Sequence, residues 1–219
     1  MLALLHTSPL HVPVFDALRD EHHPGLELRH FVAPDLLSRA RGEGPDAVAQ
    51  DVTAALHHAA ENGVQAVLCT CSTIGEVAER AADEVGVPVI RGDRPMAAAA
   101  VAAGPRIAVL ATVESTLTPT LALLDDEARR AARPIRARAQ VVPEAWTRFE
   151  AGDVEGCARL VAATADGVTD ADVILLAQAS MTPAARITTT ALPILSSPRP
   201  GLAAAAAAVR TGSARATVG

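Results

Sequence analysis

The chain has 219 residues, half of them apolar, and a formal net charge of −6. It is long enough for one large domain or two small ones with a buried core, and its acidic balance argues against nucleic acid, which needs a basic face. No apolar run reaches the length of a transmembrane helix, and the N-terminal residues lack the basic region of a signal peptide. We therefore expect a cytoplasmic protein that contacts no membrane.

All of the basic residues are Arg, and the absence of Lys has chemical consequences. Pyridoxal phosphate is held as a Lys Schiff base, and a Walker-type phosphate loop needs its Lys. The three cysteines, Cys69, Cys71 and Cys157, have neither the spacing of a zinc site nor that of a disulfide framework. Adjacent histidines are poor chelators because they do not face one way on a helix. We expect no cofactor and no metal.

Strand and helix patterns alternate along the whole chain. In the first half, the expected strands are residues 2–6, 26–32, 64–69 and 87–90, and the expected helices are residues 14–22, 46–62, 75–85 and 94–103. In the second half, the expected strands are residues 106–112, 135–142, 171–176 and 192–195, and the expected helices are residues 117–132, 153–168 and 200–210. We expect the tail, residues 211–219, to be frayed. This alternation predicts parallel sheets covered by helices on both faces.

The two halves look like copies of one unit. Residues 87–96 resemble the segment that starts 105 positions later, and residues 5–7 match the segment at the same offset. Residues 68–73 match the segment that starts 107 positions later. We predict an α/β fold of two similar lobes, residues 1–103 and 104–219, with the C-terminal helix able to pack back on the first. A pseudo-twofold axis would relate the lobes, and ligands would bind in the cleft between them.

An apolar run that ends at Cys69 is followed by Thr70-Cys71-Ser72-Thr73, and a helical pattern begins at Gly75. This order predicts a strand, a tight turn and a helix N-terminus, where backbone N–H groups favour a thiolate or a bound anion. Cys71 is therefore the candidate catalytic group. Ser72 and Thr73 are candidate hydrogen-bond donors to a bound anion, although either could equally cap the helix.

The strand-end motifs of the two halves resemble those of the aspartate/glutamate/hydantoin racemase superfamily, which includes arylmalonate decarboxylase and maleate isomerase. Cys71-Ser72-Thr73 is similar to the first-lobe motif, and residues 176–181 are similar to the second-lobe motif Leu-Gly-Cys-Ala-Gly-Met. Residues 112–116 fall where the family places hydroxyls that hold the substrate carboxylate. The resemblance extends to about Arg210 and implies a cofactor-independent enzyme in which two thiols face each other across a planar carbanion.

Gln178 stands where the resemblance places the second thiol. An amide forms hydrogen bonds but does not exchange protons usefully at neutral pH, so we do not expect symmetric two-base racemisation. A single thiol, Cys71, suits one-base isomerisation, protonation after decarboxylation, or covalent addition. The leading hypothesis is isomerisation of a small carboxylate or carbonyl compound. Decarboxylation is the alternative within enzymes, and a non-catalytic carboxylate-binding or accessory protein is the alternative outside them.

The remaining candidate residues also lie at or near strand ends. The substrate-binding candidates are Thr7, Ser8, Ser72, Thr73, Thr112, Ser115, Thr116, Gln178 and Ser180. His11 is a possible acid or base, although a surface histidine is at least as common in such a loop. The arginines that could clamp a second carboxylate are Arg91, Arg94 and Arg199. The expected partner is a small carboxylate, and a homodimer is possible.

Overall fold

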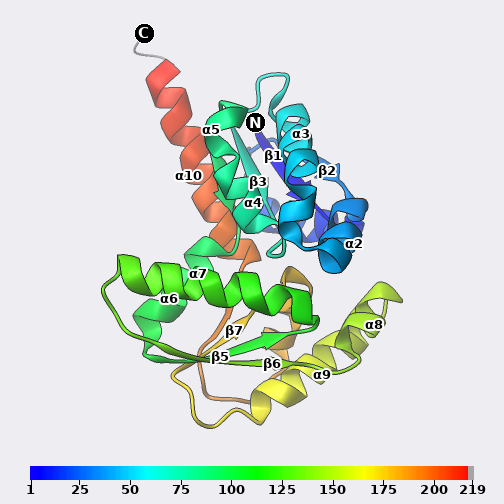
Figure 1. Cartoon of the computed structure of the whole chain (residues 1–219), viewed down its shortest axis with the longest axis vertical. Coiled ribbons are helices and arrows are strands. Elements are labelled where there is room, and N and C mark those ends of the chain that lie inside the picture. The colour runs from blue at the N-terminus through cyan, green and yellow to red at the C-terminus, as the bar shows by residue number, and fades with distance from the viewer. Residues whose placement is uncertain (217–219) are drawn as a thin grey trace. The chain divides into compact units, whose positions relative to one another are not determined.

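The computed structural model describes the backbone of residues 1–216 and the side chains of residues 1–211. The chain forms two compact units, each built on a sheet of its own (Figure 1). The first unit contains Met1–Gly92 together with helix α10 (Pro198–Ala216), and the second contains Asp93–Ser197. Over the described part of the chain, no helix is both long enough and apolar enough to span a membrane.

The first unit is built on a parallel sheet with the strand order β2-β1-β3-β4. The strands are β1 (Leu2–His6), β2 (Leu28–Val32), β3 (Ala66–Cys69) and β4 (Val89–Arg91). Leu5 of β1 pairs with Phe31 on one side and with Cys69 on the other. Because the strands are parallel, this register brings the residues that follow β1 and β3 to the same edge of the sheet.

Different helices cover the two faces of this sheet, because successive side chains of a strand point to opposite sides. One face, which carries Leu5 and Val67, is covered by α2 (Pro34–Glu43), α3 (Ala49–Ala60), α4 (Gly75–Arg80) and α5 (Ala82–Val85). The opposite face, which carries Leu4 and Leu68, is covered by α1 (Val12–His22) and α10.

The second unit repeats this plan with the strand order β6-β5-β7-β8, again all parallel. Its strands are β5 (Arg106–Ala111), β6 (Arg136–Val141), β7 (Val173–Leu176) and β8 (Ile194–Ser196). One face packs against α6 (Arg94–Ala103) and α7 (Leu117–Arg130). The other packs against α8 (Ala145–Glu150), α9 (Val154–Asp166) and the 3-10 segment η4 (Ala179–Arg186). The predicted fold class, two similar α/β lobes with parallel sheets between helices, is confirmed. The pseudo-twofold axis and the cleft stay predictions.

Two helices, α2 and α8, are absent from the sequence-based expectation. Only Leu36 and Ala40 of α2 are buried, so the helix has almost no apolar period. Helix α8 spans six residues and buries only Ala145 and Phe149. A single apolar pair four residues apart is too little for the periodicity on which a helix prediction depends.

Three other predicted helices have different bounds in the structure. The helix expected at residues 46–62 begins as the 3-10 segment η2 (Pro45–Val48) before α3, and the one expected at 75–85 is divided into α4 and α5. The last helix, expected at 200–210, continues to Ala216. The predicted fraying is therefore wrong as far as Ala216, and residues 217–219 lie outside the described chain.

The boundary between the units also differs from the predicted one after residue 103. Helix α6 packs on the second sheet, with Met96 and Val101 in one apolar core with Val109 and Leu175. The first continuous segment therefore ends at Gly92. Helix α10 packs back on the first unit, which the sequence analysis allowed, so the second unit ends at Ser197.

Candidate active site

Cys71 lies in the turn between β3 and α4, at the carboxyl end of the sheet, where the neighbouring strands β1 and β3 both end. The backbone N–H of Thr70 donates to the carbonyl of Leu5 over 3.0 Å, which ties the start of this turn to β1. Cys71 is 9 % exposed and packs against the apolar core beneath α3 and α4. A buried thiol at a strand end can meet a ligand only from the open edge of the sheet.

Cys69 supports this turn instead of adding a second reactive thiol. Its side chain is 1 % exposed, and its Sγ donates to the carbonyl oxygen of Cys71 over 3.7 Å. Helix α4, which follows, spans only six residues and has no side-chain cap at Ile74. A helix of this length has few aligned peptide dipoles and therefore gives little stabilisation to a thiolate at its start. Ser72 and Thr73 do not take the N-cap position, which Ile74 occupies.

The hydroxyl residues predicted near Cys71 have different environments. Thr7, Ser72 and Thr73 are all buried. Ser8 is half-buried, and its Oγ accepts the backbone N–H of Leu10 over 3.3 Å as the cap of the 3-10 segment η1 (Pro9–His11). Of the two interpretations of Ser8, the ordinary turn residue is the one for which the structure shows a contact.

His11 is buried enough that desolvation lowers its pKa from 6.5 to about 4. At neutral pH its imidazole is therefore uncharged. Such a ring can accept a proton or a hydrogen bond, but it holds almost no acidic proton to give away. The base role predicted for His11 is chemically open, whereas the acid role is not supported at neutral pH.

In the second unit, Thr112 and Gln178 follow the neighbouring strands β5 and β7 and contact each other. Gln178 Oε1 accepts the backbone N–H of Thr112 over 2.6 Å and its hydroxyl over 2.9 Å. Because a backbone N–H can only donate, the atom that faces it must be the amide oxygen. The orientation of the Gln178 amide is thereby fixed, and its NH₂ group is directed away from Thr112.

The same edge of the second sheet has hydroxyl groups that lack a hydrogen-bond partner within the described chain. They are the buried Oγ atoms of Ser115, in the 3-10 segment η3 (Glu114–Thr116), and of Ser180. Thr116, also predicted here, is 1 % exposed. A buried hydroxyl without a partner costs about 1–3 kcal/mol, so these groups are available to donate to a bound anion.

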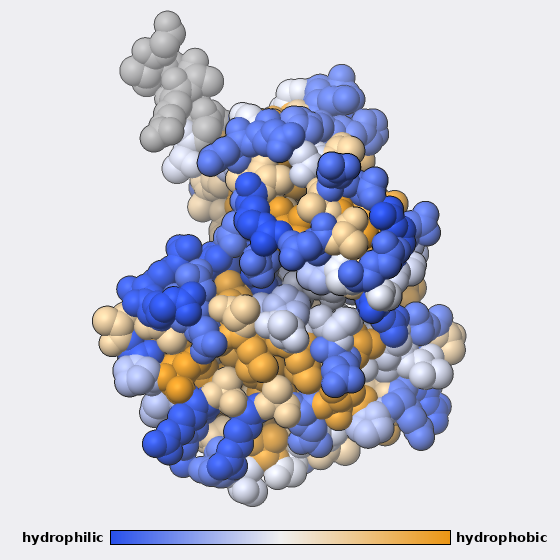
Figure 2. Space-filling model, in the orientation of Figure 1, coloured by the Kyte–Doolittle hydropathy of each residue, from blue (hydrophilic) through white to orange (hydrophobic). Residues whose placement is uncertain are grey.

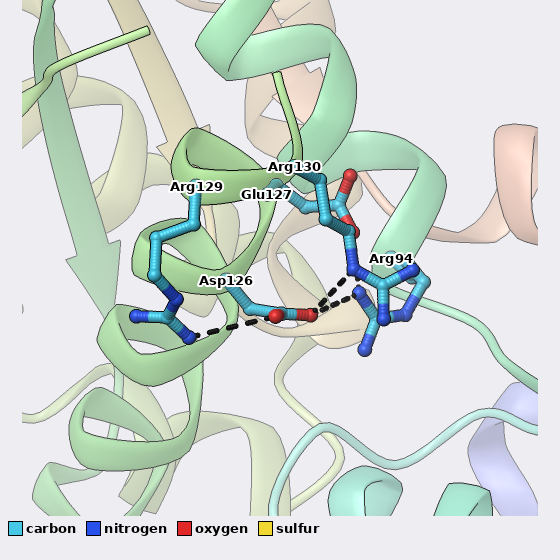
Figure 3. A network of polar contacts seen from close by, with 5 residues as sticks. All are labelled: Arg94, Asp126, Glu127, Arg129 and Arg130. Carbon is cyan, nitrogen blue, oxygen red and sulfur yellow. Dashed lines mark hydrogen bonds and ion pairs between the residues drawn. The ribbon is translucent and has the colours of Figure 1, made fainter. Parts of the chain in front are cut away.

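Arg94, one of the arginines predicted as carboxylate clamps, is engaged in ion pairs within the protein. Arg94 contacts two carboxylates of helix α7, Asp126 at 2.7 Å and Glu127, and so joins α6 to α7 (Figure 3). The hydrogen bond from Arg94 lowers the pKa of Asp126, which Arg129 and Arg130 also contact. Arg94 therefore has a structural role within the second unit.

Arg91 and Arg199 have contrasting surroundings. Arg91 is buried, and its side chain runs past Gly75, where a Cβ would lie 3.0 Å from the Arg91 Nε. Gly75 thus allows Arg91 to pack closely against the start of α4. Arg199 is exposed near the start of α10.

His6, which was not among the predicted site residues, is fully buried at the end of β1. Period-two alternation places it on the same face as Leu2 and Leu4, so the signal was a polar residue in an inward position of a strand. Within the described residues, no group of three or more His, Cys, Asp or Glu side chains is arranged to hold a metal ion.

A groove of about 870 Å³ runs along the edge strand β6 and is lined by residues such as Arg136, Arg138, Leu160 and Asp170. None of the predicted site residues lines it. The surface of the second unit in Figure 2 exposes broad apolar areas between polar side chains. Volume alone therefore does not locate the site, and the candidate chemistry lies at the strand ends.

Comparisons with known proteins agree with this plan of two similar units. The sequence model of Asp/Glu/Hydantoin racemase matches residues 14–211. Glutamate racemase RacE1 from Bacillus anthracis superimposes with a TM-score of 0.76 at 15% identity, over 96% of this chain and 82% of that one. Picrophilus torridus aspartate racemase gives 0.68 at 12% identity, over 97% and 94%. The Gly74Cys mutant of arylmalonate decarboxylase gives 0.64 at 17% identity, over 95% and 92%. No curated protein sequence matches the chain.

Proposed function

Because the chain belongs to the Asp/Glu/Hydantoin racemase family, we propose that it is a cofactor-independent isomerase of a small carboxylate. Its site of reaction is the carbon next to the carboxylate, and Cys71 is the single acid–base group. The hydroxyls and the Gln178 amide at the strand ends bind the carboxylate. A homodimer and a cytoplasmic location stay predictions.

The observation that carries this proposal is the fixed orientation of the Gln178 amide. Its oxygen is already used by two donors of Thr112, so a ligand meets the NH₂ group. An N–H donor stabilises the negative charge that develops on a carboxylate when its α-proton leaves. It does not take up that proton. The family's second acid–base position is thus converted into an anion-binding position.

The reaction then needs only one thiol. The Cys71 thiolate takes the α-proton, the C–H electron pair moves into the carboxylate as an enediolate, and the Cys71 thiol later returns the proton. Inversion requires that the proton reach the opposite face of the planar intermediate. With one thiol, the intermediate must turn over, or a water must deliver that proton.

Decarboxylation of a malonate-type diacid is a second candidate, and the same observation favours it. The C–C bond to one carboxylate breaks, carbon dioxide leaves, and the electron pair remains as the same enediolate. Cys71 then delivers one proton to carbon. This reaction needs one proton donor and an anion-binding amide, which is the pair of groups that the chain retains.

Proton exchange in heavy water separates these possibilities. Amino acids, 2-substituted acids and 2-substituted malonates are incubated with the protein and followed by NMR. Deuterium at the α-carbon of an intact substrate supports isomerisation, and carbon dioxide release from a malonate supports decarboxylation. Binding without either reaction would indicate the non-catalytic carboxylate-binding protein.

Two cysteine variants make the test specific. Cys71→Ala should abolish the exchange. Cys157→Ala should not, because Cys157 is buried in the core of the second unit and desolvation raises its pKa to about 11. Full activity of the Cys71→Ala protein would overturn the thiol mechanism.

A further inference from the structure

Four polar side chains of the first unit form a continuous hydrogen-bonded chain. His6 Nδ1 lies 2.8 Å from the Thr70 hydroxyl, and His6 Nε2 lies 2.8 Å from His30 Nδ1. His30 Nε2 in turn lies 3.3 Å from a carboxylate oxygen of Asp16 on α1. The chain thus runs from a partly exposed carboxylate to a buried hydroxyl, and Thr70 immediately precedes Cys71.

His6, in the middle of this chain, stays uncharged. Burial first, and then the neighbouring His30 and His11 rings, together lower its pKa from 6.5 to about 3. A neutral imidazole has one N–H donor and one bare acceptor nitrogen. Whichever nitrogen of His6 carries the hydrogen, the other must accept.

In the first state of this hydrogen-bonded network, each donor hydrogen points toward the Asp16 end. The Thr70 hydroxyl donates to His6 Nδ1, His6 Nε2–H donates to His30 Nδ1, and His30 Nε2–H donates to the Asp16 carboxylate. Both rings are neutral, and each contact has one donor and one acceptor. The arrangement needs no further proton.

In the second state, His30 carries an extra proton and is paired with the Asp16 carboxylate. His30 Nδ1–H then donates to His6 Nε2, so the hydrogen of His6 moves to Nδ1 and donates to Thr70. The Thr70 hydroxyl now turns to the carbonyl of Leu5, which lies 3.1 Å away. That carbonyl accepts the Thr70 backbone N–H in both states, so it is never without a donor.

We propose that His6 and His30 are positioning residues for Cys71, and that one proton on His30 decides which way the Thr70 hydroxyl points. The link to catalysis rests on the proposed function of Cys71. The switch acts on the turn itself, because Thr70 is the first residue after β3 and its hydroxyl changes partner between a side chain and the backbone of β1.

Among the described residues, charged or titratable groups reach this network from two neighbouring elements. Helix α1 contributes Asp16 and Arg19, which lie 3.4 Å apart, and η1 contributes the uncharged His11. Helix α10 faces the same side of the sheet with apolar residues, of which Leu202 is one. Asp16 is therefore the carboxylate that His30 contacts at the outer end of this network.

Nitrogen-15 NMR of the imidazole rings tests the switch without any substrate. As the pH is lowered, His30 should take up one proton, and over the same range the hydrogen of His6 should move from Nε2 to Nδ1 while His6 stays neutral. If His6 keeps its tautomer while His30 titrates, or if His6 itself becomes charged, the inference is wrong.

Asp16→Asn and Asp20→Asn form a matched pair for this experiment. Both carboxylates contact Arg19, but only Asp16 contacts His30. Asp16→Asn should change the pH range over which the hydrogen of His6 moves between its two nitrogens, because it removes the carboxylate that His30 contacts. Asp20→Asn should leave that pH range unchanged.

The effect on Cys71 is read from its rate of alkylation by iodoacetamide, located by peptide mass. The pH profile should show an inflection over the pH range in which His6 changes its tautomer, and Asp16→Asn should shift that inflection. His30→Asn keeps an acceptor for His6 but cannot titrate, so it should remove this inflection. If the inflection in the alkylation rate stays at the same pH in both variants, the positioning role is overturned. Because this measurement uses no substrate, it tests the positioning role independently of the proposed function, which α-proton exchange tests.

Discussion

At the end of β7, both donors of Thr112 hold the oxygen of the Gln178 amide. The sequence shows that a thiol is missing from this position, but it does not show which end of the amide a ligand meets. That depends on a backbone N–H of a neighbouring strand, which only the register of β5 and β7 brings into reach. In the proposed site, Gln178 therefore offers the N–H donors of its amide to a ligand because Thr112 occupies the amide oxygen. The chemistry of the amide alone leaves both roles open.

Gln178→Glu tests the proposed donor role of the Gln178 amide, because the two side chains have nearly the same size and shape. One carboxylate oxygen can still accept both hydrogens of Thr112, so the thermal unfolding midpoint should change little. The other oxygen replaces a donor with a negative charge, and the affinity for a carboxylate ligand should fall by about 10–100-fold. Calorimetric titration measures this. Gln140→Glu makes the same change at an exposed position of β6 and should bind normally. Equal affinities of the two variants would contradict the donor role.

His11 makes stability depend on pH in a defined window. Burial lowers its pKa from 6.5 to about 4, so below pH 6.5 the unfolded chain binds a proton that the folded chain does not. The free energy of unfolding is therefore unaffected by His11 above pH 6.5, and it decreases as the pH falls toward 4. At pH 5 the loss is about 2 kcal/mol. Urea denaturation at several pH values should show a flatter profile for His11→Gln. The exposed control His57→Gln should keep the normal slope, and a normal slope in His11→Gln would contradict the assignment.

At the scale of elements, helix α10 approaches the first sheet closely at Gly201. A Cβ at this position would lie 2.5 Å from the carbonyl oxygen of Gly92, just past β4. Backbone atoms on both sides leave no flexible side chain to move. The absence of a side chain at Gly201 therefore sets how near the helix can lie to the strand end.

Gly201→Ala should accordingly destabilise the protein by about 1–3 kcal/mol, although alanine is the better helix former by about 1 kcal/mol. Gly42→Ala is the matched control, because Gly42 lies in α2 with no atom within 4 Å of the Cβ it would gain. That control should be neutral or slightly stabilising. Chemical denaturation of the two variants compares them directly, and a stable Gly201→Ala protein would mean that α10 can shift away from Gly92.

The elements that could be predicted are those with a strong apolar period. The strands around Leu4, Leu68 and Leu175 are fully buried runs, and such runs bounded by turns are detectable without a structure. Helix α8 was not detectable, because it buries one pair of side chains. The same limit applies to the site. Cys71 follows a recognisable motif, whereas His6 gains its partners from β2 and from Thr70, which are distant in the sequence.

At the scale of the whole molecule, the chain repeats one plan of strands and inserts the second copy into the first. The matching order of the two sheets agrees with the internal repeat in the sequence. The path of the chain was harder to predict, because the alanine-rich helices α6 and α10 have similar sequences and each could cover either sheet. Only their packing assigns them to different units: Val101 lies in one apolar core with Val109, and Leu202 lies in another with Leu4.

Leu202→Ala and Leu123→Ala test this assignment, since both leucines are buried on helices but pack on different sheets. Each change should cost about 2–5 kcal/mol. In amide hydrogen exchange, Leu202→Ala should speed exchange mainly in β1 and β3, and Leu123→Ala mainly in β5 and β7, because local stability follows local packing. If Leu202→Ala acted mainly on β5 and β7, α10 would belong to the second unit. Equal effects on both sheets would show that the two units unfold together.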